Sequence, residues 1–123
     1  MTPLPTGTVT FLFTDIEGST RLWERDPEEM QQALPRHDAL LRQAIESHGG
    51  AIFKTVGDAF CAAFASPQPA IQAAIAAQRL LHQELPWLRV RMAVHTGTAE
   101  HREGDYFGSA LNRVARDSSV CPP

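Results

Sequence analysis

The sequence TVTFLFT at residues 8–14 runs directly into DIEGST at residues 15–20. The first segment follows Gly7 and is rich in β-branched and aromatic residues, a composition typical of a β-strand. The second segment is polar and predicts the start of a short helix that continues through Trp23. The sequence therefore predicts a strand that ends at Asp15, beside the first turn of a helix.

A second aspartate follows another predicted strand. Residues 51–56 and 59–64 are short apolar runs separated by Gly57-Asp58. Glycine readily adopts the positive φ of a tight turn, so this pair predicts a β-hairpin with Asp58 at its tip. Both Asp15 and Asp58 are thus expected where strands end.

A helix is predicted between these two strand regions. Asp26-Pro27 supplies a capping residue and a proline for the first helical position, and Gly49-Gly50 ends the helix. Pro35 lies inside the pattern and should kink or split the helix near Leu34. The residues expected on the buried face recur at helical spacing: Met30, Leu34, Leu41, Ile45 and His48.

A second helix is expected to begin after its cap, Ser66, and to end at Pro86. Residues 88–95 then alternate apolar and polar side chains, which predicts a strand that is buried on one face. The inner stripe expected for the helix is Ala70, Ile71, Ala74, Ile75, Ala77 and Leu81.

The order of these elements is that of a ferredoxin-like α+β sandwich, βαββαβ, with an antiparallel sheet and helices on one face. In a right-handed βαβ unit the first two strands are parallel, so Asp15 and Asp58 should meet at one end of the sheet. Two adjacent carboxylates could hold two divalent metal ions that bind a nucleoside triphosphate or another phosphate ester. The alternative is that both aspartates are solvated turn residues.

A third polar group, DYFGSALNRVAR, occupies residues 105–116. On a helix that begins near Gly108, Asn112 and Arg116 are four residues apart and share one face. These two side chains could reach a sugar and a phosphoryl group. The alternative is an ordinary solvated helix face.

Composition limits the class of protein. With 123 residues, 43% apolar and 20% charged, the chain should form a single domain over residues 1–123. The net charge is −3 and the basic residues are scattered, which argues against nucleic acid as a partner. We expect no membrane-spanning segment, a cytoplasmic location, and Cys61 and Cys121 as free thiols.

Five short motifs are recognisable together: FTDIEGST at 13–20, HGG at 48–50, KTVGDAF at 54–60, HTG at 95–97 and GDYFGSALNRVAR at 104–116. In order and spacing the chain resembles the class III adenylate and guanylate cyclase catalytic domain, from about residue 9 to residue 116. The resemblance implies a head-to-tail homodimer with two active sites, each built from both subunits. It leaves room for further regulatory domains in a parent protein.

The resemblance also implies a role for each matching residue. Asp15 and Asp58, with the Ile16 carbonyl, would hold two Mg²⁺ or Mn²⁺ ions, and backbone amides would hold the phosphates. The opposite subunit would supply the base-recognition, ribose-orienting and phosphoryl-stabilising groups. The phosphate-binding amides would be those of Gly18, Ser19 and Thr20. From the opposite subunit, Lys54 and Asp105 would recognise the base. Asn112 would orient the ribose, and Arg116 would stabilise charge on the phosphoryl group.

The base-recognition pair favours ATP. A lysine can donate a hydrogen bond to adenine N1, and an aspartate can accept one from the 6-amino group, whereas guanine presents an N–H and a carbonyl there. Lys54 and Asp105 therefore predict an adenylate cyclase that makes 3′,5′-cyclic AMP and pyrophosphate by a two-metal mechanism. The alternative is a catalytically degenerate cyclase-like module that binds nucleotide, dimerises or acts as a sensor.

The end of the chain departs from the family pattern. After Arg116 the sequence reads DSSVCPP at residues 117–123, where such cyclases continue the helix and add a further strand and a dimer-stabilising arm. This divergent tail suggests a truncation or a change of reading frame. We therefore expect the 123-residue chain to be mostly monomeric and at best feebly active.

Overall fold

The computed structural model describes residues 7–102 and 105–107, with side chains described as far as residue 98. Strands β2, β3, β1, β4 and β5 lie side by side in that order, and every neighbouring pair is antiparallel. The ferredoxin-like α+β fold is confirmed. The elements in chain order are β1 (Gly7–Ile16), α1 (Ser19–Arg25), α2 (Pro27–Ser47), β2 (Ala51–Val56), β3 (Ala59–Phe64), α3 (Pro67–Glu84), β4 (Val90–Arg102) and β5 (Asp105–Phe107).

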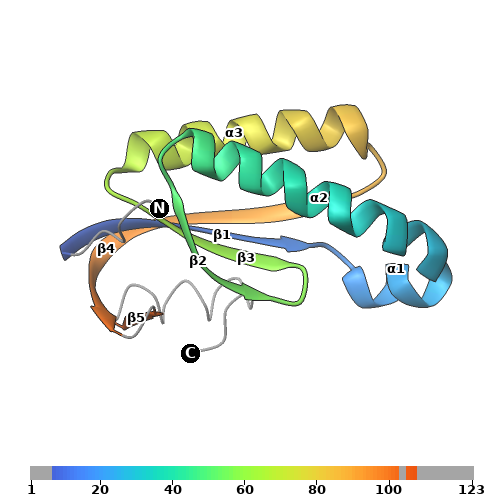
Figure 1. Ribbon diagram of the computed structural model, residues 1–123, viewed down its shortest axis with the longest axis horizontal. Helices are drawn as coiled ribbons and strands as arrows, with labels where there is room; N and C mark the ends of the chain where they lie inside the picture. Colours follow the sequence, from blue (N-terminus) through green and yellow to red (C-terminus); the bar gives the residue numbers. More distant parts are fainter. Residues whose placement is uncertain (1–6, 103–104, 108–123) are drawn as a thin grey trace.

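The long helices α2 and α3 run side by side over one face of the sheet (Figure 1). Their apolar faces and the inward side chains of β1 and β3 form the main core. None of the helices among the described residues is both long enough and apolar enough to cross a bilayer. The largest members of this core are Leu12, Met30, Leu40, Leu41, Ile45, Phe60, Phe64 and Leu81.

The opposite sheet face is also apolar. Phe11 and Phe13 are fully buried there and stack with ring centroids 5.9 Å apart. Cys61 lies beside them in the β1–β3 register and is disulfide-bonded, so the expected free thiol is wrong for this residue. Cysteine number and compartment are statistical guides that carry no geometry, which is why they misled here. Cys121 lies outside the described residues.

Helix α2 continues without interruption through Pro35, so the predicted split is wrong. Pro35 lies on the exposed side of the helix, as does Gln31 four residues earlier. Proline removes the hydrogen bond to the Gln31 carbonyl, but water can satisfy a carbonyl on the exposed side. The predicted start is confirmed, because the Asp26 carboxylate accepts a hydrogen bond from the Glu29 N–H at 3.2 Å.

Helix α3 begins after Ser66 as predicted, but its buried stripe differs from the expected one. Ala70, Ala73, Ala77 and Leu81 are buried, whereas Ile71 and Ile75 are about half exposed. Three small alanines let the helix approach the sheet closely. With the alanine face against the sheet, both isoleucines point outward. Ile75 then lines a shallow apolar hollow with Ala74 and Met92 from β4.

Strand β4 is longer than the alternating pattern indicated. It begins at Val90 and extends past His95 to Arg102, because β1 offers a ladder partner as far as Gly7, opposite Ala99. Periodicity in sequence detects only the part of a strand that has one buried face. The remainder is fixed by the length of its neighbour.

The β2–β3 hairpin forms as predicted, with Gly57 at φ +58° in the turn. The β2 ladder contains one extra residue, Phe53, between Ile52 opposite Ala62 and Lys54 opposite Cys61. Such a bulge places two residues of one strand against one of its partner. The Phe53 ring packs edge-on against Phe11 at 6.0 Å, so it lies on the sheet face opposite the helices.

We expect Gly50→Ala to destabilise the fold strongly. A Cβ atom there would lie 2.5 Å from the Phe64 ring and 2.7 Å from Ile45, so a buried side chain would have to move. Overpacking of this kind should lower the free energy of unfolding by about 2 kcal/mol. Gly49→Ala is the control, because its Cβ would meet open space and its φ of +80° should cost about 1 kcal/mol. Urea unfolding of both variants is the measurement, and equal losses would contradict the packing argument.

Candidate active site

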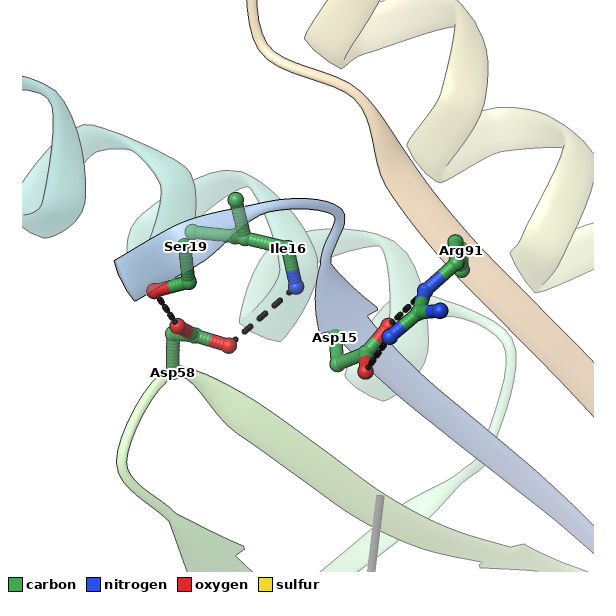
Figure 2. Close-up of polar contacts among 5 residues, drawn as sticks. All are labelled: Asp15, Ile16, Ser19, Asp58 and Arg91. Atoms are coloured by element: carbon green, nitrogen blue, oxygen red, sulfur yellow. Dashed lines mark hydrogen bonds and ion pairs between the residues drawn. The ribbon is translucent and has the colours of Figure 1, made fainter. Parts of the chain in front are cut away.

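Asp15 lies at the end of β1, directly opposite Arg91 in the β1–β4 register. The guanidinium of Arg91 forms a bidentate pair with the Asp15 carboxylate (Figure 2): Nε donates to Oδ1 at 2.8 Å and Nη2 donates to Oδ2 at 2.5 Å. The Asp15 side chain is only 14% exposed, whereas that of Arg91 is 58% exposed. Both oxygens of Asp15 therefore bind a cationic group at the rim of the sheet.

Asp58 reaches the same corner of the molecule from the tip of the β2–β3 hairpin. Its Oδ1 accepts a hydrogen bond from the Ile16 backbone N–H at 3.1 Å, and its Oδ2 accepts one from the Ser19 hydroxyl at 2.5 Å. Figure 2 shows this carboxylate beside the chain that leads from Asp15 into α1. The predicted convergence of Asp15 and Asp58 is thus confirmed.

The start of α1 lies beside both carboxylates. Gly18 is the N-cap in the left-handed region, at φ +66°, and no side chain caps the helix. The Ser19 hydroxyl points instead to Asp58, while Gly18 and Thr20 are exposed. The first amides of any α-helix lack acceptors within the helix, so this turn can offer N–H donors to an anion. Phosphate binding by Gly18, Ser19 and Thr20 remains a prediction.

Three carboxylates lie near the Arg91 guanidinium. The pKa of its guanidinium is raised above the ordinary value, first by the hydrogen bonds to Asp15 and by the charge of that carboxylate. The charges of Glu17 and Asp58 raise this pKa further. Three carboxylates therefore stabilise one positive charge at this corner, and a divalent cation would find the same field.

The donor set fits magnesium or manganese. Among the described residues no group of three or more acidic, histidine or cysteine side chains gathers into a complete cage. Mg²⁺ rarely uses such a cage, since it usually keeps several waters and binds one or two carboxylates together with substrate phosphates. Asp15 and Asp58 supply two carboxylates, and the bidentate guanidinium on Asp15 shows that a cation is already accommodated.

This constellation can be compared with known proteins. A model of the adenylate and guanylate cyclase catalytic domain matches residues 1–121 of the chain. The chain belongs to this family. The match includes the strand that carries Asp15, the hairpin that carries Asp58, and most of the tail that departs from the expected pattern.

Relatives and solved structures agree with this assignment. An uncharacterized protein of Mycobacterium tuberculosis is 40% identical over 114 residues, which are 91% of this chain and 39% of that protein. An adenylate cyclase of Podospora anserina is 34% identical over an alignment of 146 residues, covering 95% of this chain and 7% of that protein. A Trypanosoma brucei adenylate cyclase, solved in its monomeric state, superposes with a TM-score of 0.79 at 31% identity, over 95% of this chain and 71% of that one. An adenylate/guanylate cyclase/hydrolase from Silicibacter pomeroyi gives a TM-score of 0.80 at 28% identity, over 94% and 72%. The chain thus spans less than half the length of the two curated relatives, 39% of the mycobacterial protein and 7% of the Podospora cyclase.

The predicted base-recognition residues lie far apart in the strand order. Lys54 is half-buried on β2, and its register with Cys61 places it on the sheet face opposite α2 and α3. Asp105 belongs to β5, at the other end of the order β2-β3-β1-β4-β5. The Asp105 side chain and the whole of Asn112 and Arg116 lie outside the part of the chain that the structure describes.

Arg91 is the residue beside Asp15 that the sequence argument missed. The alternation of residues 88–95 placed it on the polar side of a strand, where an exposed arginine is ordinary. The available signal was the antiparallel pairing of β1 with β4: once Phe13 is placed opposite Ala93, Asp15 falls opposite Arg91. Sequence alone gives no such register.

Proposed function

We propose that this cyclase domain converts ATP to 3′,5′-cyclic AMP and pyrophosphate. The observation that carries the proposal is the meeting of Asp15 and Asp58 at one corner of the sheet, each carboxylate oriented by fixed hydrogen-bond donors. The reaction is an in-line attack of the ribose 3′-hydroxyl on the α-phosphorus, and it needs no protein nucleophile. Two oriented carboxylates of this kind suit metal-assisted phosphoryl chemistry.

Asp15, Asp58 and the Ile16 carbonyl would hold two Mg²⁺ or Mn²⁺ ions. When bound, the two ions lower the pKa of the ribose hydroxyl and offset the negative charge that develops on the phosphate. The protein's own contribution is orientation: the Ile16 N–H and the Ser19 hydroxyl hold the Asp58 carboxylate in place. Groups that hold a ligating carboxylate typically matter about tenfold to a hundredfold for metal affinity.

The phosphates would lie against the first turn of α1. Gly18 brings no Cβ to the surface there, so the backbone amides of Gly18, Ser19 and Thr20 can approach an anion closely. The position suits the proposal because Ser19 also contacts Asp58. Metal and phosphate would then be held by adjacent atoms of one turn.

Each active site would be shared between two copies of the chain. Lys54 and Asp105 would recognise the base, Asn112 would orient the ribose, and Arg116 would stabilise charge on the transferring phosphoryl group, all from the partner copy. We further propose that the homodimer works in the cytoplasm, where ATP is available, under regulatory domains of a parent protein.

Turnover with manganese tests the proposal. The 123-residue chain is incubated with ATP and Mn²⁺ at several protein concentrations, and cyclic AMP is separated by liquid chromatography. We expect specific activity to rise with concentration, because a shared site forms only when two copies meet. If the chain binds a non-cleavable ATP analogue but forms no cyclic AMP from ATP at any protein concentration, the alternative is supported: a catalytically degenerate nucleotide-binding module.

Base selectivity should depend on Lys54 and Asp105. The double variant Lys54→Glu with Asp105→Cys exchanges donor and acceptor groups at the base edge, so we expect the ratio of ATP to GTP turnover to fall by about tenfold or more. The control is Arg79→Glu, which also reverses a charge but lies on exposed α3, across the sheet from Lys54. An unchanged ratio in the double variant would remove both residues from base recognition.

A further inference from the structure

Both oxygens of Asp15 are occupied by one side chain. Arg91 Nε and Nη2 bond to Oδ1 and Oδ2, and the β1–β4 ladder holds the two residues directly opposite each other. The β1–β4 ladder fixes the backbone positions of both residues, so the pair is placed by the sheet and not by a loop. The contact is therefore a built-in feature of the sheet end.

A metal ion at Asp15 would need the same oxygens. A bidentate guanidinium occupies the outer edge of a carboxylate, which is also where a divalent ion binds. Two cationic groups on one carboxylate repel each other, and the negative charges of Glu17 and Asp58 attract both to the same corner. Arg91 and a metal ion thus compete for Asp15.

We propose that Arg91 is the counter-ion of Asp15 when no metal is bound, and that metal binding must release it from Asp15. The inference rests on the proposed metal site and goes beyond it by assigning a positioning role to Arg91. Without a metal ion, the guanidinium holds the Asp15 carboxylate in a fixed orientation and neutralises part of the repulsion between adjacent carboxylates. It also weakens metal binding by the free energy needed to break the pair.

The exposure of the two partners makes this exchange feasible. The Arg91 side chain is 58% exposed and extends from a strand edge, so it can swing into water once it leaves Asp15. Asp15 is only 14% exposed and stays where β1 places it. The release therefore moves one side chain and leaves the sheet unchanged.

Mn²⁺ binding without nucleotide tests the competition, measured by electron paramagnetic resonance of the free ion. An exposed bidentate pair opposes binding modestly, so we expect Arg91→Gln to bind Mn²⁺ about fivefold more tightly than the unmodified chain. Arg91→Lys keeps the charge but loses the fork, and should fall between the two. Arg89→Gln is the matched control, since it removes the same charge from an exposed residue two positions away.

A spectroscopic readout follows the exchange directly. The Nε–H resonance of Arg91, assigned by its absence in Arg91→Lys, should shift during a Mg²⁺ titration with the midpoint of metal binding. Equal or weaker Mn²⁺ binding by Arg91→Gln, equal tightening by Arg89→Gln, or a resonance insensitive to Mg²⁺ would each overturn the proposal. Asp15→Asn separates the two levels of inference. If it leaves Mn²⁺ affinity unchanged, the metal site itself is wrong, whereas Asp15-dependent binding without tightening in Arg91→Gln refutes only the role of Arg91.

Discussion

Asp58→Asn should abolish nearly all cyclase turnover. The substitution keeps the size of the side chain and its ability to accept from the Ile16 N–H, but it removes the negative charge that would hold a divalent ion. Loss of a ligand to a catalytic metal should lower the rate by about 10³-fold, at the upper end of the effect of losing a single hydrogen-bond donor to the reacting group. Initial rates of cyclic AMP formation at saturating Mn²⁺ provide the measurement.

The control for this variant is Glu24→Gln, which makes the same acid-to-amide change on an exposed residue of α1. It should retain turnover within about twofold, because an exposed surface charge has little effect on local chemistry. Circular dichroism of both variants checks that the fold persists. If Asp58→Asn kept more than a tenth of the unmodified rate at saturating Mn²⁺, the assignment of Asp58 as a metal ligand would fail.

Two inactive variants should recover activity when they are mixed. Asp58→Asn damages the half of the site that holds metal, and Arg116→Ala damages the half that the partner copy supplies. In a random mixture half of the dimers are heterodimers, and each carries one intact site and one doubly damaged site. We therefore expect about a quarter of the unmodified turnover, from components that each show almost none.

The mixing experiment needs evidence that heterodimers form. Differently tagged variants are co-purified, and turnover is measured on the doubly tagged fraction as well as on each variant alone. A mixture of Asp58→Asn with Asp15→Asn is the matched control, because both changes lie in the same half and no intact site can arise. Heterodimers without turnover would show that each site is built within one chain.

The convergence of Asp15 and Asp58 was predictable from sequence because it depends only on the order of elements. A strand, a helix and a hairpin leave few ways to arrange the sheet, and the ends of parallel strands meet at one edge. The glycine of the turn and the cap at Asp26 added local signals whose chemistry is well understood. These features hold whatever the details of packing.

The features that sequence reasoning missed all depend on tertiary contacts. Arg91 could be placed on a strand, but its pairing with Asp15 follows from a register that no local pattern encodes. Ile71 and Ile75 fitted a helical stripe as well as the alanines do, and the closeness of α3 to the sheet decided which face was buried. Pro35 broke a local rule that solvent on the outer side of α2 relaxes.

The extra residue in β2, Phe53, separates two parts of the strand whose side-chain orientations are set by different contacts. Ile52, before the bulge, packs against the core between the sheet and the helices. Lys54, after the bulge, pairs with Cys61 in the ladder of the hairpin that carries Asp58. If the strand had no bulge, Phe53 would take a ladder position of its own, and regular alternation would place Ile52 on the same face as Lys54, away from the core. The bulge therefore lets Ile52 face the core while Lys54 keeps its register with the hairpin that carries Asp58.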